Sequence, residues 1–257
     1  MNPILEVKNI SKKYQSKENE ILAITDINFN IYKGEFVSII GPSGCGKSTV
    51  LSVIAGLVEK TEGEILIENE KVQGVTEKMG YMLQKDCLLE WRTVESNVFF
   101  GLEIKNKLNK ESKEYVINLL KKYGLYEFKD KFPNELSGGM RQRVSLIRTL
   151  ATKPEILLLD EAFSALDYQT RLMVTNDIYE ILKKENITVL MITHDISEAI
   201  SMSDRVIVLT KRPGKVKNIH SIEFKIPNRT PLLRRKFPEF SGYFDKLWKE
   251  LGVNEGE

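Results

Sequence analysis

A glycine-rich segment between an apolar run and a helical pattern constrains the fold more than any other feature of this 257-residue chain. Residues 36–40 are mostly apolar, as expected of a strand covered on both faces, and the apolar spacing over residues 48–57 predicts a helix. The segment between them matches G-x-x-x-x-G-K-[ST], the pattern of a phosphate-binding loop, or P-loop. It contains Gly41, Pro42, Ser43, Gly44, Cys45, Gly46, Lys47, Ser48 and Thr49. The order of strand, P-loop and helix predicts a phosphate site in an α/β fold.

The residue types of the P-loop suit a bound phosphate. Glycines let successive backbone N–H groups turn inward without a Cβ atom in the way. The helix that follows directs its free N–H groups and its positive dipole end at the same anion. Lys47 can neutralise the β- and γ-phosphate oxygens, and the Ser48 hydroxyl can bind Mg²⁺. Cys45 occupies a variable position of the pattern, so no catalytic role is assigned to it.

Two acidic residues follow a second apolar run at residues 156–159, which has the pattern of a buried strand. Asp160 would lie at the carboxyl end of this strand, where a carboxylate can hold the Mg²⁺ shell. Glu161 can face a water molecule in line with the γ-phosphate and act as the general base. An acid after an apolar strand is a weak signal alone, but it is strong beside a P-loop.

Strand and helix patterns alternate through much of the chain, which predicts a mostly parallel sheet of doubly wound type. The other buried-strand patterns are residues 188–192 and 205–209, and helical patterns cover residues 168–184 and 197–202. Alternating runs at residues 5–10 and within residues 21–31 predict two half-buried strands near the N-terminus. Strand signals vanish between residues 93 and 132, where Glu, Lys, Leu and Asn predict a helical insertion.

Composition excludes several classes of protein. Thirty-eight basic and 36 acidic residues give a net charge of +2, which argues for no polyanionic partner such as a nucleic acid. Two cysteines cannot form a disulfide framework or a four-cysteine zinc site. No run approaches the roughly 18 apolar residues of a membrane span, and residues 1–6 do not resemble a signal peptide. We therefore expect a cytoplasmic chain, held at a membrane only through another protein.

Residues 136–143 read Leu-Ser-Gly-Gly-Met-Arg-Gln-Arg and resemble the signature motif of ATP-binding-cassette (ABC) ATPases. Four other segments fit the same family in the right order. Tyr14 resembles its adenine-stacking aromatic residue, Gln84 its Q-loop glutamine, residues 164–167 its D-loop and His194 its switch histidine. The resemblance covers residues 14 to 195, and it implies ATP and Mg²⁺ as ligands and ATP hydrolysis as the activity.

The signature segment has a physical reading of its own. Ser137, Gly138 and Gly139 open a helix with small residues and so form a second anion-binding helix N-terminus. One chain has no obvious use for two such cradles, whereas two copies facing head to tail would each offer the signature to the other's P-loop. The resemblance and this argument both imply a homodimer that sandwiches two ATP molecules in composite sites.

Further roles are implied residue by residue, each with a plainer alternative. His194 would contact the γ-phosphate, or be a buried core histidine. Gln84 would contact Mg²⁺ and water while sensing the helical insertion, or be an ordinary loop residue. Tyr14 would stack on adenine or simply pack. Asp167 would be a D-loop aspartate, a helix N-cap or both. The implied catalytic set is Glu161, His194, Lys47 and Gln84, and the implied Mg²⁺ ligands are Ser48, Gln84 and Asp160.

Four segments look like the nitrate/sulfonate/taurine importer group of this family: residues 84–94, the signature segment at residues 137–143, the Arg-Pro-Gly turn at residues 211–216, and the C-terminal stretch at residues 231–251. Two residues depart from the usual pattern. Glu90 stands where that group has Pro before Trp91, so the contact with a membrane subunit can differ locally there. Ala162 replaces the Pro that normally follows the two acids. Leu88, Leu89 and Trp91 are candidates for the groove that grips a membrane subunit, or else for ordinary core residues.

The resemblance implies a P-loop ATPase of ABC-cassette type in three parts. A RecA-like core with an N-terminal antiparallel β subdomain is expected over residues 1–92 and 133–210. A helical subdomain is expected over residues 93–132, running into the signature helix to about residue 152. Residues 211–257 form a basic C-terminal extension, which is either a solvated tail packed by its aromatic residues or a docking surface for a partner or anionic lipid.

The function implied is that of the ATP-hydrolysing subunit of an importer of a small solute of nitrate, sulfonate, taurine or thiamine-precursor type. Its partners would be a second cassette, two integral membrane permease subunits and, indirectly, an extracytoplasmic solute-binding protein. It would lie at the cytoplasmic face of the cell membrane. The alternatives are a separate ATPase subunit of an exporter, a regulatory ABC ATPase without a transport role, and a soluble P-loop kinase or GTPase. A second anion cradle at residues 137–139 argues against the last of these.

Overall fold

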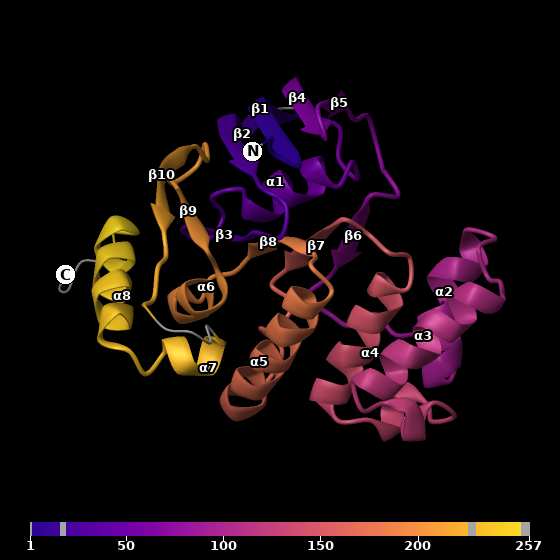
Figure 1. Ribbon diagram of the computed structural model, residues 1–257. Helices are drawn as coiled ribbons and strands as arrows, with labels where there is room; N and C mark the ends of the chain where they lie inside the picture. The colour runs from indigo at the N-terminus through magenta and orange to yellow at the C-terminus, as the bar shows by residue number, and fades with distance from the viewer. Residues whose placement is uncertain (1, 16–18, 226–229, 253–257) are drawn as a thin grey trace. The chain divides into compact units, whose positions relative to one another are not determined.

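The computed structural model describes residues 2–15, 19–225 and 230–252 (Figure 1). The chain divides into two compact units. Unit 1 is made of two segments, Met1–Thr76 and Asn186–Glu257, and unit 2 of the continuous segment Glu77–Glu185. The P-loop therefore belongs to unit 1, and the two acids and the signature segment belong to unit 2.

An antiparallel sheet forms the N-terminal part of unit 1. Its strand order is β2-β1-β4-β5, and the strands are β1 (Leu5–Gln15), β2 (Glu20–Ile31), β4 (Glu62–Ile67) and β5 (Glu70–Lys71). The alternation of residues 5–10 predicted the start of β1, but the strand continues to Gln15 through irregular pairing with β2. Such bulges shift the side-chain period, so the simple alternation ends before the strand does.

The second sheet of unit 1 carries the P-loop. Its strands follow the order β10-β9-β3-β8 and are β3 (Phe36–Ile40), β8 (Thr188–Ile192), β9 (Arg205–Leu209) and β10 (Val216–Ser221). β3 pairs in parallel with both β8 and β9, and all of its residues are buried. The apolar run that leads into the P-loop is therefore a central strand, as predicted. Helix α1 (Lys47–Ile54) follows β3, and α6 (Ile196–Met202) connects β8 to β9.

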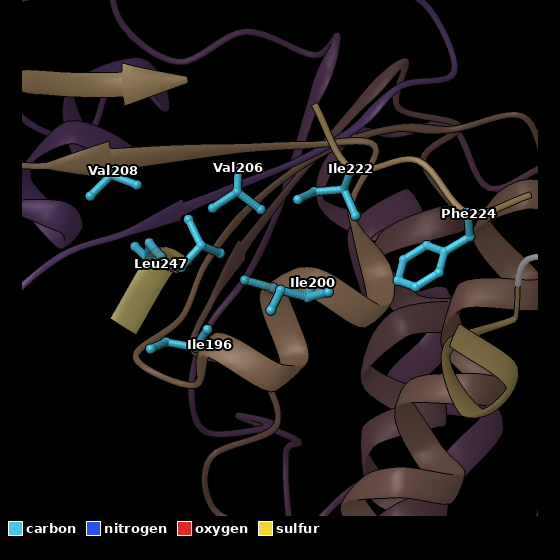
Figure 2. Close-up of a cluster of buried hydrophobic side chains, with 9 residues drawn as sticks. Ile196, Ile200, Val206, Val208, Ile222, Phe224 and Leu247 are labelled. Carbon is cyan, nitrogen blue, oxygen red and sulfur yellow. The ribbon is translucent and has the colours of Figure 1, made fainter. Parts of the chain in front are cut away.

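The C-terminal segment completes the core of unit 1. Helices α7 (Pro231–Arg234) and α8 (Pro238–Glu250) follow β10, and Figure 1 shows α8 beside that strand. Leu247 of α8 enters a buried cluster with side chains of β9 and α6, shown in Figure 2; the cluster comprises Ile40, Ile196, Ala199, Ile200, Val206, Val208, Ile222, Phe224 and Leu247. Four aromatic residues of the segment, Phe237, Phe240, Tyr243 and Phe244, pack against it.

Polar contacts also attach this segment to unit 1. Arg234 is fully buried and donates from Nη1 to the Ser203 carbonyl at 2.6 Å. Glu250 lies at the end of α8. Its Oε1 accepts a hydrogen bond from Nδ2 of Asn218, and its Oε2 lies 2.5 Å from Nε2 of His220. The aromatic packing expected of a tail is present, and the basic residue Arg234 is a core residue.

Unit 2 combines two parallel strands with helices. β6 (Met79–Met82) pairs with β7 (Ile156–Asp160), and the helices are α2 (Val94–Ile104), α3 (Lys110–Lys122), η1 (Tyr126–Phe128), η2 (Pro133–Glu135), α4 (Gly138–Leu150) and α5 (Tyr168–Lys184). Polar side chains cap the α-helices, namely Thr93, Asn109, Ser137 and Asp167. α4 packs against α2, α3 and α5.

The helical insertion predicted between residues 93 and 132 is confirmed as α2, α3 and η1. The helix predicted over residues 168–184 has the same bounds in the structure, because Asp167 caps its start and two lysines occupy its last turn. In the described part of the chain, no helix combines the length and the apolar character that a bilayer-spanning segment needs.

Candidate functional site

The P-loop of unit 1 is shaped by close backbone packing. Gly46 has a φ of 106°, and a Cβ atom there would lie 2.5 Å from Cγ2 of Ile24 and 3.0 Å from the Ala23 carbonyl. A Cβ atom on Gly41 would lie 2.8 Å from Sγ of Cys45. Both contacts are shorter than a Cβ atom tolerates, so glycine is favoured at both positions for steric reasons and at Gly46 for conformational reasons as well. Gly44 has a φ of 71° and completes the turn.

Helix α1 presents its N-terminus at the end of this loop. Gly46 precedes its first residue, and no described side chain caps it. Lys47 is buried and donates from Nζ to the Gly41 carbonyl at 2.8 Å and to the Pro42 carbonyl at 3.1 Å. Its ammonium group is thereby held over the loop, next to backbone N–H groups at the helix N-terminus. Ser48 and Ser43 are exposed. This arrangement can bind a phosphate group.

Tyr14 lies at a hollow on β1. The hollow has a volume of about 450 Å³ and is lined by Lys12, Lys13, Tyr14, Gln15 and Thr61. The Tyr14 side chain is 40% exposed, and Nζ of Lys12 lies 5.1 Å from its ring centroid. An exposed aromatic ring beside a hollow of this size can stack on a flat heterocycle.

His194 follows β8 directly and is exposed. The alternative of a buried core histidine is therefore wrong. The next residue, Asp195, caps α6 by accepting the Glu198 N–H at 3.1 Å. The cap holds the junction between β8 and α6, and it leaves the imidazole at the carboxyl end of a strand that neighbours β3.

The two acids of unit 2 lie at the carboxyl end of β7. Oδ2 of Asp160 accepts the Tyr81 hydroxyl at 2.9 Å. Burial raises the pKa of the Asp160 carboxyl; the Tyr81 hydrogen bond opposes this, and the negative charge of Glu161 adds to it. Glu161 has a φ of 46°, an uncommon conformation for a non-glycine residue that is often found at functional sites.

Gln84 and the D-loop segment are joined to Glu161 by hydrogen bonds. Nε2 of Gln84 donates to the Ser164 hydroxyl at 3.0 Å, and this hydroxyl donates to the Glu161 carbonyl at 2.9 Å. The Ser164 N–H also reaches that carbonyl at 3.1 Å. Gln84, Asp160, Glu161 and Ser164 are thus brought together in unit 2. Asp167 caps α5 by accepting the Thr170 N–H at 3.1 Å, so the N-cap alternative is confirmed.

The signature segment forms the N-terminus of α4. Ser137 is exposed and caps the helix by accepting the Met140 N–H at 3.3 Å. A Cβ atom on Gly139 would lie 2.8 Å from Cγ2 of Val174, and one on Gly138 would lie 3.1 Å from Cδ2 of Leu166. The two glycines therefore permit close packing within unit 2 and leave the first turn of α4 with little side-chain bulk.

A polar clamp that the sequence analysis missed holds the segment after Gln84. Arg141 of α4 donates to both carboxylate oxygens of Asp86, at 2.8 and 3.1 Å, and to Glu90 at 2.6 Å. Burial would raise the pKa of Asp86, but hydrogen bonds from Arg141 and Leu88 and the charges of Arg141 and Arg148 outweigh it, so this pKa is lowered. Arg148 adds bonds to the carbonyls of Asp86 and Cys87.

Asn97 of α2 makes the second part of the clamp. It is fully buried; its Oδ1 accepts the Leu89 N–H at 2.8 Å, and its Nδ2 donates to the carbonyls of Leu89, Arg92 and Thr93. Helical spacing places Asn97 on the same face as Val94 and Val98, which are also buried. That spacing was the signal that could have revealed it.

The three candidates for a groove wall have different surroundings. Leu88 is 7% exposed and so is a core residue, whereas Trp91 is 74% exposed. Leu89 is intermediate. Trp91 is therefore the member of this set that can meet a partner.

The oxygen ligands expected for Mg²⁺ suit that ion. Ser48 supplies an exposed hydroxyl in the first turn of α1, Asp160 a partly buried carboxylate and Gln84 a side-chain amide. Mg²⁺ prefers oxygen donors and commonly takes only one or two from the protein, with the rest from water and substrate phosphate. The donor set fits, with Ser48 in unit 1 and the other two in unit 2.

Comparisons with known proteins agree with these features. The family model described as ABC transporter matches residues 24–164. The chain is 45% identical over 251 residues to "Uncharacterized ABC transporter ATP-binding protein YtlC" of Bacillus subtilis, covering 98% of this chain and 96% of the relative. It is 38% identical over 258 residues to "Nitrate import ATP-binding protein NrtD" of Synechocystis, covering 98% and 97%.

A solved structure shares the fold. The dimeric post-hydrolysis state of the ATP-binding cassette MJ0796 bound to ADP and Pi matches with a TM-score of 0.72 and 34% identity, covering 86% of this chain and 99% of that one. The family match spans more than half of the sequence, and the relatives cover nearly all of it. This chain therefore belongs to the ABC transporter family, as an ATP-binding subunit of P-loop cassette fold that resembles the nitrate/sulfonate/taurine importer group.

Proposed function

We propose that this chain hydrolyses ATP to drive the import of a small solute through separate membrane subunits. The observation that carries the proposal is the likeness to a nitrate import ATP-binding protein over 98% of this chain, including the segments on either side of Trp91. The solute would be of the nitrate, sulfonate, taurine or thiamine-precursor type. It would meet the permease subunits and an extracytoplasmic binding protein, while this chain works at the cytoplasmic face of the membrane.

Unit 1 would bind the nucleotide. The backbone N–H groups of the P-loop and of the first turn of α1 would hold the phosphates, and Lys47 would balance the charge of the β- and γ-phosphates. Its bonds to the Gly41 and Pro42 carbonyls keep the ammonium group at the loop before substrate arrives. Tyr14 would stack on the adenine from its hollow on β1.

Unit 2 would supply the groups for hydrolysis. Asp160 and Gln84, together with Ser48 of unit 1, would hold Mg²⁺, which would supply positive charge to the phosphates. Glu161 would take a proton from the attacking water as general base. The Ser164 hydroxyl donates a hydrogen bond to the Glu161 carbonyl and accepts one from Nε2 of Gln84. A movement of Gln84 would therefore shift the backbone of Glu161, the proposed base.

The active form would be a homodimer. Ser137, Gly138 and Gly139 of one copy would face the ATP bound at the P-loop of the other, with His194 beside the γ-phosphate. An exposed helix N-terminus with two glycines in its first turn can approach a phosphate closely. The dimeric state of MJ0796 with ADP and Pi supports this arrangement.

The first test is the mass of the Glu161→Gln variant in solution, measured by light scattering with and without Mg-ATP. Gln retains the shape of Glu but cannot accept the proton, so hydrolysis should fall by about 100-fold or more and the closed dimer should accumulate. Glu155→Gln, just before β7, is the matched control and should keep wild-type turnover.

An ATP-dependent shift from monomer to dimer in Glu161→Gln alone would support the composite site and Glu161 as the base. Unchanged turnover in this variant would overturn the assignment of Glu161. If Glu161→Gln binds ATP without a change in mass, the next measurement is ATP hydrolysis by the Ser137→Arg variant in the complex assembled with its membrane subunits. Normal hydrolysis there would remove the role of the signature segment.

The coupling to a membrane partner is tested separately. We expect the wild-type chain to co-purify with integral membrane subunits. Because Trp91 is exposed and is not one of the implied catalytic residues, Trp91→Ala should leave basal ATPase activity largely intact while it uncouples transport. Equal loss of both activities would contradict the coupling role. Absence of any membrane partner would favour a regulatory ATPase instead.

A further inference from the structure

A short turn that follows β9 is built as a rigid unit. The turn comprises Thr210, Lys211, Arg212, Pro213, Gly214 and Lys215, and we call it the 210–215 turn. The Thr210 N–H donates to the Lys215 carbonyl at 2.9 Å, and Thr210 Oγ1 accepts the Lys215 N–H at 3.0 Å. The single hydrogen of this hydroxyl is shared between the carbonyls of Lys211 and Pro213, which lie 3.0 and 3.2 Å from Oγ1. One threonine therefore fixes the backbone of the whole turn.

The 210–215 turn is fastened to β2. The Gly214 N–H donates to the Ala23 carbonyl at 3.0 Å, and the Thr25 N–H donates to the Gly214 carbonyl at 3.0 Å. These bonds make a parallel bridge between Ile24 and Gly214. Ala23 and Ile24 are also the residues that exclude a Cβ atom from Gly46. The turn and this part of β2 are therefore joined, and together they pack against the P-loop.

Two residues of the turn touch the P-loop itself. A Cβ atom on Gly214 would lie 2.2 Å from the Cys45 carbonyl, so the two backbones are in direct contact. Arg212 donates from Nε to the Gly44 carbonyl at 3.2 Å, and a Cβ atom on Gly44 would lie 3.7 Å from its Nη2. The guanidinium group therefore lies along the tip of the phosphate-binding loop, although Arg212 is distant in sequence and outside the family match at residues 24–164.

We infer that Arg212 is a positioning residue for the P-loop, which holds the Gly44–Cys45 peptide in the turn where the Cys45 N–H donates to the Pro42 carbonyl, and which places a positive charge at the tip of the loop. A peptide group is planar, and its C=O and N–H point in opposite directions. A donor that fixes the Gly44 carbonyl on the outer side therefore fixes the plane of the whole peptide. This matters most at Gly44 and Gly46, because glycines have the widest conformational freedom to lose.

The inference rests on the proposed function only in requiring that the P-loop binds nucleotide phosphates. Its test is the affinity of the purified full-length chain for Mg-ATP, ADP and AMP, measured by titration calorimetry. Arg212→Ala should weaken binding of ATP and ADP by about three- to tenfold, the range for an exposed charged hydrogen bond. AMP binding should be weakened less, because a P-loop holds the α- and β-phosphates and AMP has only the α-phosphate.

Two further variants separate geometry from charge. Lys211→Ala removes one positive charge from the same turn without touching the P-loop, and it should change ATP affinity by less than about twofold. Arg212→Lys keeps the charge but loses the planar donor, and it should fall between the wild type and Arg212→Ala. It also carries the test if Arg212→Ala fails to fold.

Two results would overturn the inference while leaving the proposed function intact. The first is that the wild-type chain binds ATP, but Arg212→Ala and Lys211→Ala change the ATP affinity by the same factor. The other is an equal loss of ATP and AMP binding together with a lower melting temperature of the nucleotide-free chain, which would assign Arg212 a general structural role. A wild-type chain that binds no ATP would overturn the proposed function and this inference together.

Discussion

The two units hold their functional loops by different means. In unit 1 the P-loop is confined chiefly by close steric contact, of Gly46 with Ile24 and of Gly214 with Cys45, and hydrogen bonds from Lys47 and Arg212 add to it. In unit 2 the segment after Gln84 is held by charged and amide side chains, chiefly Arg141, Arg148 and Asn97. The first kind of support depends on shape and the second on hydrogen bonds.

This difference has a mechanical meaning. Close-packed contacts have one arrangement and resist small displacements, which suits a loop that must present backbone N–H groups to a phosphate. Hydrogen bonds between side chains and backbone can be exchanged for others at low net cost, because each bond contributes only about 1 kcal/mol. A segment held in that way can move as a unit, and this suits a loop that relays a change to a partner.

The largest effect on nucleotide binding is expected from Gly46→Ala, which changes the steric support directly. The new methyl group would lie 2.5 Å from Ile24 at a φ that L-residues rarely adopt. Strain and overpacking together should lower ATP affinity on the order of 100-fold. Calorimetric titration measures it, with Gly242→Ala as the control, since a Cβ atom there would meet no neighbour. A loss below about threefold would mean that the P-loop is more adaptable than its packing indicates.

Leu247→Ala comes next and tests whether unit 1 depends on apolar packing far from the P-loop. Leu247 is 1% exposed in the cluster of Figure 2, and a cavity there should cost about 2–5 kcal/mol of unfolding free energy. Urea unfolding measures this cost. Lys246→Ala, the exposed neighbour, should change stability by no more than about 0.5 kcal/mol. A Leu247 effect as small as that of Lys246 would show that α8 is only loosely attached.

Arg141→Met tests the polar support of unit 2. It removes three hydrogen bonds and leaves the partly buried Asp86 carboxylate without its guanidinium partner. We expect a loss of about 1–3 kcal/mol in urea unfolding. Arg143→Met is the matched control on the same helix, because Arg143 lies 3.9 Å from Asp177 and forms a looser ion pair. If the two variants lose the same unfolding free energy, the hydrogen bonds of Arg141 do not give unit 2 any particular support.

The smallest expected effect is a gain in stability from Asp160→Asn. The raised pKa of Asp160 means that the folded chain binds this proton more tightly than the unfolded chain. Stability is therefore lost as the pH rises from the ordinary aspartate pKa of 3.8, which the unfolded chain has, through the higher pKa of the folded chain, and the cost is complete above it. Asn carries no charge, so the melting temperature of the metal-free variant should exceed that of wild type at pH 7 but not at pH 4. Hydrolysis should be lost. The prediction is contradicted if the melting temperatures of the variant and the wild type differ by the same amount at pH 4 and at pH 7.

The sequence predicted the features that repeat or carry a strong local signal. Residues 36–40 and 168–184 have the same bounds in the structure, because a mostly apolar run and a capped amphipathic helix leave few alternatives. His194 and the two acids are found at strand ends, as expected of residues directly after buried strands.

The rest was hidden for physical reasons. Arg234 stands in a basic run that is typical of a solvated face, yet it is fully buried because Ser203 and Asp204 supply its partners from elsewhere in the chain. The bond from Arg212 to Gly44 and the clamp at Asp86 join residues far apart in sequence. Periodicity and spacing describe one element at a time, so such contacts require the fold.

The discontinuous course of unit 1 has a consequence for the synthesis of the chain. β3 can pair with β8 and β9 only after the ribosome has made the whole of unit 2 and the strands beyond it. Unit 2 is continuous in sequence and can fold during that interval, whereas the apolar residues of β3 wait without partner strands. Unpaired apolar strands are sites of aggregation, so slow translation between residues 41 and 209 would lengthen the exposure. The P-loop is therefore synthesised early, but β3, the strand that precedes it, can pair with its neighbouring strands only late in synthesis.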